Sequence, residues 1–161
     1  MNRVEKIHDK VSVKNAIISV YDKNGIETFA RSLMEALPEL RVYSTGDTFR
    51  LIEKSLTNPM KTRLKKISDY TGNREMQGGL VKTLDYKIYL GLLSEPFNQY
   101  HEQDRSRAGA FEFDLVVINL YPFSKVISGE DTDAEDARSN IDIGGPCLLR
   151  ASAKNYLRVC P

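Results

Sequence analysis

Residues 15–37 read NAIISVYDKNGIETFARSLMEAL, a short apolar run followed by a polar turn and a stretch with helical spacing of apolar residues. The residues that carry this spacing are Ile26, Phe29, Leu33, Met34 and Leu37. Apolar residues at three- and four-residue intervals form one face of a helix, whereas a short continuous run is typical of a buried strand. The stretch therefore predicts a strand that feeds an amphipathic helix through the turn at residues 23–25.

The same order recurs further along the chain. Residues 40–45 (LRVYST) form a second short apolar run, and a small polar turn at residues 46–48 leads into the helical stretch 49–56. Residues 113–123 (FDLVVINLYPF) are the clearest buried strand, because their apolar continuity is typical of a parallel sheet covered on both faces. Repeated strand, turn and helix units of this kind predict an α/β fold with a mostly parallel sheet.

Three other stretches are less regular. Residues 57–79 contain helix breakers and charges, and they predict a long functional loop in which only the part around Leu64 to Ile67 pairs as a strand. Residues 102–109 (EQDRSRAG) predict a charged linker. Residues 132–141 (TDAEDARSNI) predict a helix with Thr132 as its N-cap, because acidic residues fill the first turn.

The composition limits the class of protein. A chain of 161 residues is long enough for one domain, which we expect over residues 15–161 after an N-terminal extension at 1–14. The formal net charge of +1 gives no reason to expect nucleic acid or an anionic membrane as a partner. A secretory signal and an apolar run of roughly 20 residues are both missing, so we expect a cytoplasmic protein. Cys147 and Cys160 make neither a disulfide framework nor a metal set.

Small polar residues gather where the predicted strands end, which is where α/β folds bind ligands. Ser19, Thr45 and Thr48 lie at two such ends, beside helix starts whose free N–H groups favour an anion. Lys23 adds a mobile positive charge suited to phosphate. The alternative is that the hydroxyls cap helices and Lys23 is solvated, but the recurrence of the pattern favours phosphate. No P-loop or dinucleotide fingerprint is present, so a nucleoside triphosphate site is not expected.

Two further turns carry candidate site residues. Lys82 and Thr83 follow a glycine pair that would let the backbone approach a ligand, although a surface lysine is the plain alternative. Asn119 and Tyr121 follow the buried strand, and Tyr121 is equally compatible with a packed ring.

The stretch IDIGGP at residues 141–146 predicts a tight turn into a helix. Gly144 and Gly145 permit the turn, and Pro146 suits the first helical position. Asp142 either caps this turn or serves a site. Lys154 would lie about 12 Å along the helix axis from Pro146, where its plain role is to complement the helix carboxyl end.

Taken together, five motifs in order resemble the IMP cyclohydrolase domain of the bifunctional purine biosynthesis proteins. They are SVYDKNGIETFARSL (19–33), STGDT (44–48), SDYTGNREMQGGLVKTLDYKIYLGLL (68–93), DLVVINLYPF (114–123) and NIDIGGPCLLRASAKN (140–155). The resemblance implies a methylglyoxal synthase-like fold, which is a Rossmann-like three-layer sandwich with a mostly parallel central sheet. It also implies a homodimer that closes 5-formamidoimidazole-4-carboxamide ribonucleotide to IMP with loss of water, the last step of de novo purine biosynthesis.

The resemblance implies no metal or redox cofactor, and a purine ribonucleotide as the small-molecule partner. The formyltransferase domain of those proteins has no counterpart here, so the chain is either a stand-alone version, for which a separate AICAR transformylase is an expected partner, or an isolated piece. The residues implied around the phosphate are Ser19, Lys23, Thr45, Gly46, Thr48 and Thr83. Those implied around the reacting groups are Lys82, Asn119, Tyr121, Asp142 and Lys154, with Gly144 and Gly145 in the substrate-binding turn.

For that second group we hypothesise catalytic roles, because ring closure needs proton movement and stabilisation of an oxyanion. Asp142 with Lys154 would handle the carboxamide proton. Lys82, Tyr121 and the backbone beside Asn119 would stabilise or protonate the formyl oxygen as it leaves as water.

Several positions depart from the family pattern, among them Leu90, where the family has a small residue. Leu80 replaces an arginine that faces the phosphate, Asp85 and Tyr89 replace histidines, and Asp47 replaces a glycine of the phosphate loop. An arginine–phosphate contact is charge-assisted, so its loss predicts weaker nucleotide binding. The departures favour an alternative function, a non-catalytic or altered-specificity nucleotide-binding module of the same fold. Methylglyoxal synthase is a third possibility, which rests on the shared fold alone.

Overall fold

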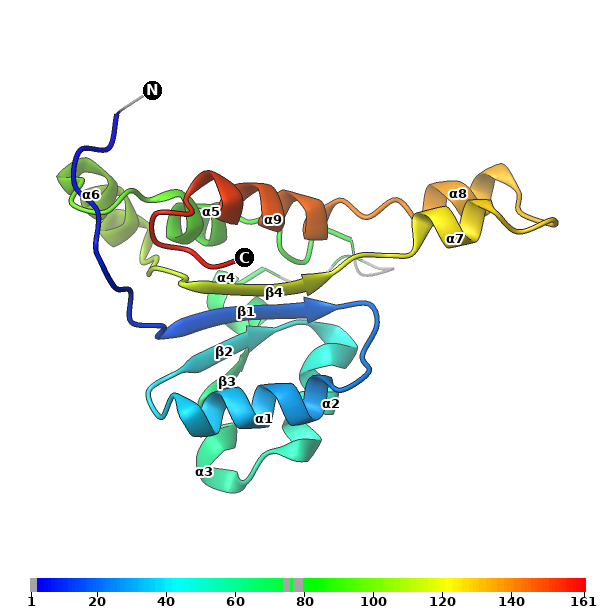
Figure 1. Cartoon of the computed structure of the whole chain (residues 1–161), viewed down its shortest axis with the longest axis horizontal. Coiled ribbons are helices and arrows are strands. Elements are labelled where there is room, and N and C mark those ends of the chain that lie inside the picture. Colours follow the sequence, from blue (N-terminus) through cyan, green and yellow to red (C-terminus); the bar gives the residue numbers. More distant parts are fainter. Residues whose placement is uncertain (1–2, 74–75, 77–79) are drawn as a thin grey trace.

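A computed structural model describes residues 3–73, 76 and 80–161, and its strands form one parallel sheet in the order β3-β2-β1-β4 (Figure 1). The strands are β1 (Asn15–Val20), β2 (Arg41–Ser44), β3 (Leu64–Lys66) and β4 (Leu115–Asn119). The central strand β1 pairs with β2 and β4, so that Ile17 lies opposite both Tyr43 and Val116. The predicted parallel sheet is confirmed.

Helices cover both faces of this sheet. They are α1 (Ile26–Ala36), α2 (Gly46–Ser55), α3 (Asn58–Lys61), α4 (Ile67–Thr71), α5 (Tyr86–Leu93), α6 (Gln99–Ala108), α7 (Phe123–Ile127), α8 (Ala134–Ser139) and α9 (Gly144–Lys154). In Figure 1, α1, α2 and α3 lie below the sheet, whereas α5, α6 and α9 lie above it. The three-layer α/β sandwich is thereby confirmed. Among the described residues, no helix is long and apolar enough to cross a bilayer.

Each face of the sheet has its own apolar core. Ile17 and Ile18 are neighbours on β1 and are both fully buried, because successive side chains of a strand point to opposite faces. Ile18 packs in the core that contains Met34 of α1, and Ile17 packs in the core that contains Leu148 of α9. Each buried isoleucine contributes about 1.5–3 kcal/mol.

Helix α1 follows the predicted apolar spacing with one exception. Its buried residues are Ile26, Ala30 and Met34, whereas Phe29 is 45% exposed at the edge of the apolar stripe. The helix ends where the Arg63 guanidinium donates to the carbonyl oxygens of Met34, Leu37 and Leu40 at 3.1–3.2 Å. This contact ties β3 to the end of α1.

Two predicted irregular stretches are wrong in part. The predicted loop at 57–79 contains α3, β3 and α4. Strand β3 confirms the strand expected near Leu64. Residues 74–75 and 77–79 of that stretch lie outside the described residues. The predicted linker at 102–109 lies largely within α6, which begins at the N-cap Asn98. None of the α6 residues is buried, so the helix has no apolar face that periodicity would detect.

Two predicted helix starts also differ from the structure. The N-cap of α8 is Asp133, because its carboxylate accepts from the Asp136 amide and the Asp136 carboxylate accepts from the Asp133 amide. The hydroxyl of Thr132 instead donates to the Val126 carbonyl oxygen at 2.7 Å. Pro146 is the third residue of α9, and it still lies in the first turn, where a missing N–H breaks no helical hydrogen bond.

Candidate functional site

The carboxyl ends of β1, β2 and β4 meet at one edge of the sheet, because all the strands run parallel. Helices α1, α2 and α9 begin at this edge. The N-cap residue of α2, Thr45, makes no side-chain capping hydrogen bond. The first-turn N–H groups of α2 are therefore not capped by that side chain and can meet an anion.

Hydroxyl groups line the junction of β1 and α2. The Ser19 and Thr45 hydroxyl oxygens are 3.3 Å apart, and the Thr48 hydroxyl donates to the Val20 carbonyl oxygen at 3.2 Å. The Ser44 hydroxyl donates to the Ile18 carbonyl oxygen at 2.6 Å. Three of the predicted phosphate-binding residues, Ser19, Thr45 and Thr48, are therefore brought together, and Thr48 also fastens α2 to β1.

Lys82 and Thr83 lie against the starts of two helices. A Cβ atom placed on Gly46 would lie 3.2 Å from the Lys82 ammonium, and Gly46 has the positive φ of 47° that favours glycine. A Cβ atom placed on Gly144 would lie 2.7 Å from the Thr83 hydroxyl. The turn that carries Lys82 and Thr83 therefore joins the start of α2 to the start of α9, and both glycines allow that close approach.

Positive charge surrounds the first turn of α2. The pKa of Asp47 is lowered first by a hydrogen bond from Arg50 and by its charge, and then by the charges of Lys23 and Lys82. The Lys23 ammonium also donates to the Tyr21 carbonyl oxygen at 2.9 Å. Sequence reasoning missed Arg50, although its spacing of three residues from Asp47 on a helix is a signal for an ion pair.

Asn119 fastens the loop between β1 and α1. Its side-chain oxygen accepts from the amides of Tyr21 at 2.6 Å and Asp22 at 2.9 Å, and its side-chain nitrogen donates to the Asp22 carbonyl oxygen at 2.7 Å. The loop that Asn119 fastens carries Lys23. Asn119 therefore positions a candidate ligand-binding residue through its side chain.

The exit of β4 meets the start of α9. Tyr121 is 44% exposed, and its ring packs edge to face on Tyr21 with 5.1 Å between the centroids. Asp142 accepts from the Gly145 amide at 2.9 Å, and a Cβ atom on Gly145 would lie 2.6 Å from the Leu120 side chain. Asp142 thus caps the turn, as one of the two predicted roles requires, and it lies at the same edge as Tyr121.

Lys154 is the last residue of α9. Ten residues separate it from Gly144, which corresponds to about 15 Å of rise along the helix axis. Its grouping with Asp142 therefore stays a prediction that rests on the resemblance.

Comparison with known proteins identifies the family. A model of the MGS-like domain matches residues 25–147. The chain belongs to the MGS-like domain family. It is also 43% identical over 141 residues to the bifunctional purine biosynthesis protein PurH of Prochlorococcus marinus (strain NATL1A). The aligned region covers 88% of this chain and 26% of that protein. The PurH protein of Thermoanaerobacter sp. (strain X514) is 45% identical over 143 residues, with coverage of 89% and 27%.

This MGS-like domain also has a solved structural relative. A structure described as "Crystal structure of ForH" superposes with a TM-score of 0.75 at 30% identity, and the match covers 91% of this chain and 70% of that chain. The likeness confirms the predicted fold. The chain spans about a quarter of the length of the PurH relatives it matches.

In this MGS-like domain, two of the residues that depart from the family pattern are carboxylates with hydrogen-bond partners in the structure. Asp85 is the N-cap of α5, where its carboxylate accepts from the Lys87 amide at 2.8 Å and the Asn73 side chain at 2.7 Å. Asp47 is paired with Arg50. Both carboxylates that replace neutral or basic groups are therefore hydrogen-bonded within the protein, which reduces their repulsion of an anion.

Two further departures are apolar or aromatic. Leu80 is 59% exposed, and it provides no hydrogen-bond donor where the family has a guanidinium. Burial is the main cause that raises the pKa of the Tyr89 hydroxyl to about 12. This phenol therefore stays protonated at neutral pH, where a histidine would titrate.

Among the described residues, no group of three or more histidine, cysteine, aspartate or glutamate side chains could hold a metal ion.

Proposed function

We propose that this MGS-like domain is an IMP cyclohydrolase, which closes 5-formamidoimidazole-4-carboxamide ribonucleotide to IMP with loss of water. The main support is the turn of Lys82 and Thr83, which contacts the starts of α2 and α9 at Gly46 and Gly144. One nucleotide can span these two helix starts. The likeness to the PurH proteins supports the choice of substrate.

The nucleotide phosphate would bind at the start of α2. The helix there offers N–H groups without a side-chain cap from Thr45, and the Ser19 hydroxyl lies beside them. Lys23 and Lys82 supply positive charge at the same place. Two ammonium groups in this arrangement would partly replace the guanidinium that is missing at Leu80.

The ring closure needs positioning and proton movement. The carboxamide nitrogen attacks the formyl carbon of the same molecule, so holding the two groups in contact supplies much of the rate. The carboxamide nitrogen loses one proton and the formamido nitrogen loses another, and the formyl oxygen gains both and leaves as water. Asp142 with Lys154 would accept the proton of the carboxamide, while Lys82 and Tyr121 would donate to the formyl oxygen.

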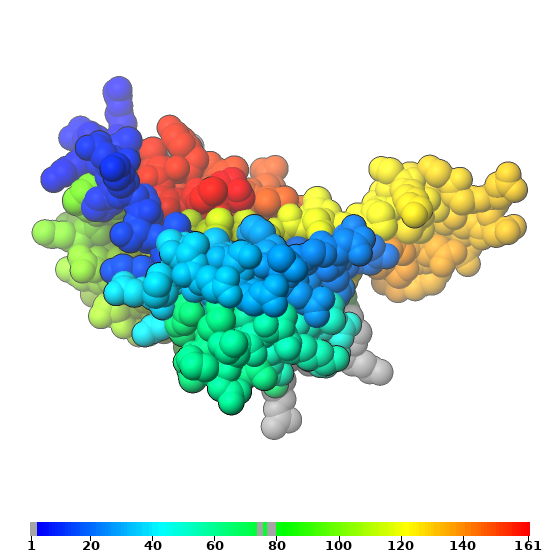
Figure 2. All heavy atoms as spheres, turned by 60° about the horizontal axis from the view of Figure 1, so that its bottom comes forward, coloured from blue at the N-terminus to red at the C-terminus, as the bar shows by residue number. Residues whose placement is uncertain are grey.

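We also propose that two copies of the chain associate through the arm, defined as residues 123–139 with helices α7 and α8. Neither helix contains a buried residue, and the arm stands apart from the body as a separate lobe (Figure 2). It exposes Phe123 and Ile127, which are 38% and 48% accessible. Sedimentation of the wild type and of an Ile127→Glu variant tests this, since the variant should be monomeric; a monomeric wild type would refute it.

The enzyme proposal is tested by following IMP formation by absorbance. Asp142→Asn and Lys154→Ala should each lower kcat by at least about 100-fold, as expected for groups that move protons. Lys54→Ala is the matched control, because Lys54 is an exposed lysine in the last turn of α2. Unchanged rates in both site variants would refute the assignment of these roles.

Leu80 favours the second candidate, a nucleotide-binding module without catalysis, because the departure affects binding of the phosphate. The assay of IMP formation separates the two functions, and thermal unfolding with and without IMP tests the nucleotide binding that they share. Saturating nucleotide should stabilise either protein by about 2.7 kcal/mol at one hundred times Kd, but only the enzyme forms IMP. A wild type that gains no stability from IMP would contradict both candidates.

A further inference from the structure

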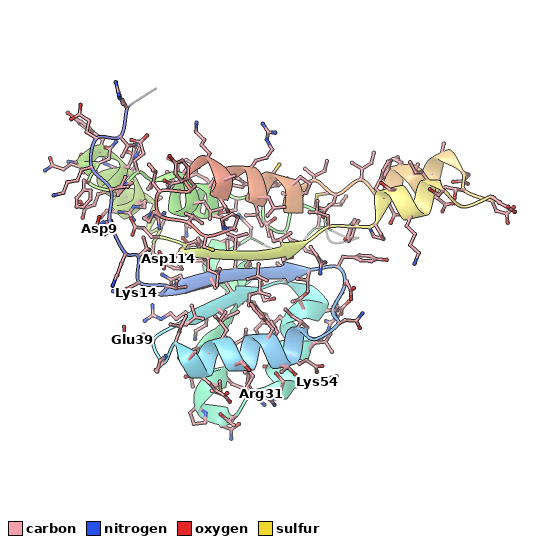
Figure 3. All side chains as sticks on the ribbon, in the orientation of Figure 1. Asp9, Lys14, Arg31, Glu39, Lys54 and Asp114 are labelled. Carbon is pink, nitrogen blue, oxygen red and sulfur yellow. The ribbon has the colours of Figure 1, made fainter. Side chains whose placement is uncertain are left out.

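A cavity of about 700 Å³ lies at the amino edge of the sheet, opposite the candidate site. Its walls come from residues 8–15, from α6 and from residues 110–114, and Arg158 completes them. Figure 3 shows Lys14 and Asp114 at the amino ends of β1 and β4. The length of β1 separates this cavity from the candidate site by roughly 16 Å.

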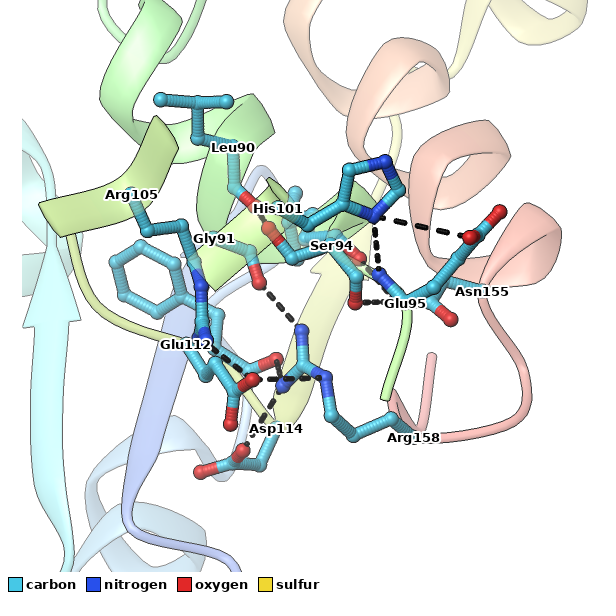
Figure 4. A network of polar contacts seen from close by, with 12 residues as sticks. Leu90, Gly91, Ser94, Glu95, His101, Arg105, Glu112, Asp114, Asn155 and Arg158 are labelled. Carbon is cyan, nitrogen blue, oxygen red and sulfur yellow. Dashed lines mark hydrogen bonds and ion pairs between the residues drawn. The ribbon is translucent and has the colours of Figure 1, made fainter. Parts of the chain in front are cut away.

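The floor of the cavity is a buried network of charged groups (Figure 4). Arg158 has a side chain that is only 3% exposed, and it donates to the carbonyl oxygens of Phe113 and Gly91 and to the Asp114 carboxylate. The same carboxylate accepts from the Lys14 and Asn15 amides at 2.8 and 3.0 Å. The charge of Asp114 is therefore compensated within the protein.

A second ion pair extends this network. The Arg105 guanidinium lies 2.5 Å from the Glu112 carboxylate. That carboxylate is also 3.7 Å from the Nε atom of Arg158, which is too long for a hydrogen bond. Glu112 is thus also compensated, and of the carboxylates that line the cavity only Glu102 has no ion pair among the described residues.

Two donors in the network have no acceptor. The Nε atoms of Arg105 and Arg158 are buried and make no hydrogen bond within the described part of the chain. Both arginines line the cavity. A buried N–H group without an acceptor is unfavourable, and such groups in native proteins commonly mark the place of a water molecule or an ion.

The rim adds positive charge to these donors. Lys10 and Lys14 line the cavity, are exposed, and form no ion pair among the described residues. Lys14 also lines an adjoining hollow of about 410 Å³ together with Arg41 and Arg63, where Glu39 is the acidic residue. Cationic side chains therefore outnumber anionic ones around the two connected hollows.

The N-terminal wall of the cavity is anchored by aromatic contacts. The His8 ring lies 4.3 Å from the Phe97 ring, and the Lys6 ammonium lies 4.4 Å from the centre of the same ring. These contacts hold the segment before β1 against the turn that precedes α6. The cavity is thus built between two parts of the chain that touch each other.

We propose that this cavity binds a compact oxyanion of at least two negative charges, namely the phosphoryl group of a small metabolite. The volume is in the range of about 300–1,000 Å³ that ligand sites occupy. Ammonium groups and guanidinium N–H groups are the donors that phosphate prefers, and the site offers both. The bound anion would lie between the exposed ammonium groups of Lys10 and Lys14, above the buried guanidinium groups, and would fasten the N-terminal segment to α6, independently of the reaction at the other edge.

The proposal is tested by titrating the 15N-labelled protein with inorganic pyrophosphate at constant ionic strength and following backbone amide signals. The amides of Asn15 and Asp114 should shift and saturate. The double variant Lys10→Ala/Lys14→Ala should weaken this binding at least tenfold and still show the wild-type melting profile, because both lysines are exposed. Lys54→Ala should bind as the wild type does.

A second double variant separates this site from the candidate site, which would also attract phosphate. Lys23→Ala/Lys82→Ala should leave the shifts of Asn15 and Asp114 unchanged and should remove those of Thr45. Shifts confined to Thr45, or wild-type affinity at Asn15 in the Lys10→Ala/Lys14→Ala protein, would overturn the proposal. Either result leaves the proposed cyclohydrolase activity to its own assay.

Discussion

Replacing Asn119 by alanine should weaken nucleotide binding without unfolding the protein. The Asn119 side chain makes hydrogen bonds of 2.6, 2.9 and 2.7 Å to the backbone of Tyr21 and Asp22, which lie about a hundred residues earlier in the chain. These bonds fasten the loop that carries Lys23. In Asn119→Ala the loop must be ordered by the ligand itself, so part of the binding energy is lost.

The size of the effect follows from the three bonds. A hydrogen bond contributes about 0.5–1.5 kcal/mol net, and the lower end applies because water can replace Asn119 in this exposed loop. The loss of stability should therefore be about 1.5–2 kcal/mol, or about 3–8 °C in Tm for a domain of this length. If the whole loss also appears in binding, the Kd for IMP should rise about 10- to 30-fold.

Asn119→Asp is the matched variant. Its carboxylate can still accept from the Tyr21 and Asp22 amides, but it cannot donate to the Asp22 carbonyl oxygen. We expect an intermediate Kd and an intermediate Tm, measured by calorimetric titration with IMP and by thermal unfolding. A folded Asn119→Ala protein with the wild-type Kd would refute the argument that this side chain positions Lys23.

Three further perturbations have definite expected results. Leu80→Arg should lower the Kd for IMP at least tenfold in the same titration, because it adds a charge-assisted contact with phosphate. Gly144→Ala should destabilise the protein by about 1–3 kcal/mol in urea unfolding, since its Cβ would lie 2.7 Å from the Thr83 hydroxyl. Arg158→Leu should cost about 3–5 kcal/mol at pH 7, because it leaves the buried Asp114 carboxylate without its ion pair. Burial is the largest influence on the pKa of Asp114 and raises it. The hydrogen bonds from two backbone amides and the charge of Arg158 lower this pKa, but they do not cancel the effect of burial. Without Arg158 this folded-state pKa rises further above the unfolded value, so protonation favours the folded state and the deficit should shrink as urea unfolding is repeated from pH 7 down to pH 5. A deficit that does not depend on pH would contradict this account of Asp114.

Strands β1 and β4 were predictable because they are largely apolar runs. Residues 15–20 and 115–119 are covered on both faces, so nearly every position in them is apolar and the pattern needs no knowledge of the partner strand. Helix α6 was not predictable in this way, since it buries none of its residues. Only its ends carried a signal, namely Asn98 as N-cap and Gly109 in the left-handed conformation at the C-cap.

The candidate site was predictable in its residue types but not in its contacts. Strand ends and helix starts indicated where Ser19, Thr45 and Thr48 would meet, because parallel strands end at one edge. The partners of Asn119 lie 97 and 98 residues away, and no local pattern relates them. The pairing of Asp47 with Arg50 could have been expected from their spacing, but its effect on a nearby anion depends on side-chain direction.

The arm begins two residues after Tyr121 and ends three residues before Asp142. Both ends of the arm therefore connect to the body of the protein beside the candidate site. We expect a small rotation of the lobe to change the distance between the Tyr121 hydroxyl and the Asp142 carboxylate, because the arm joins the body next to both residues. Substitutions far out on α8 should for this reason be judged by turnover as well as by solubility.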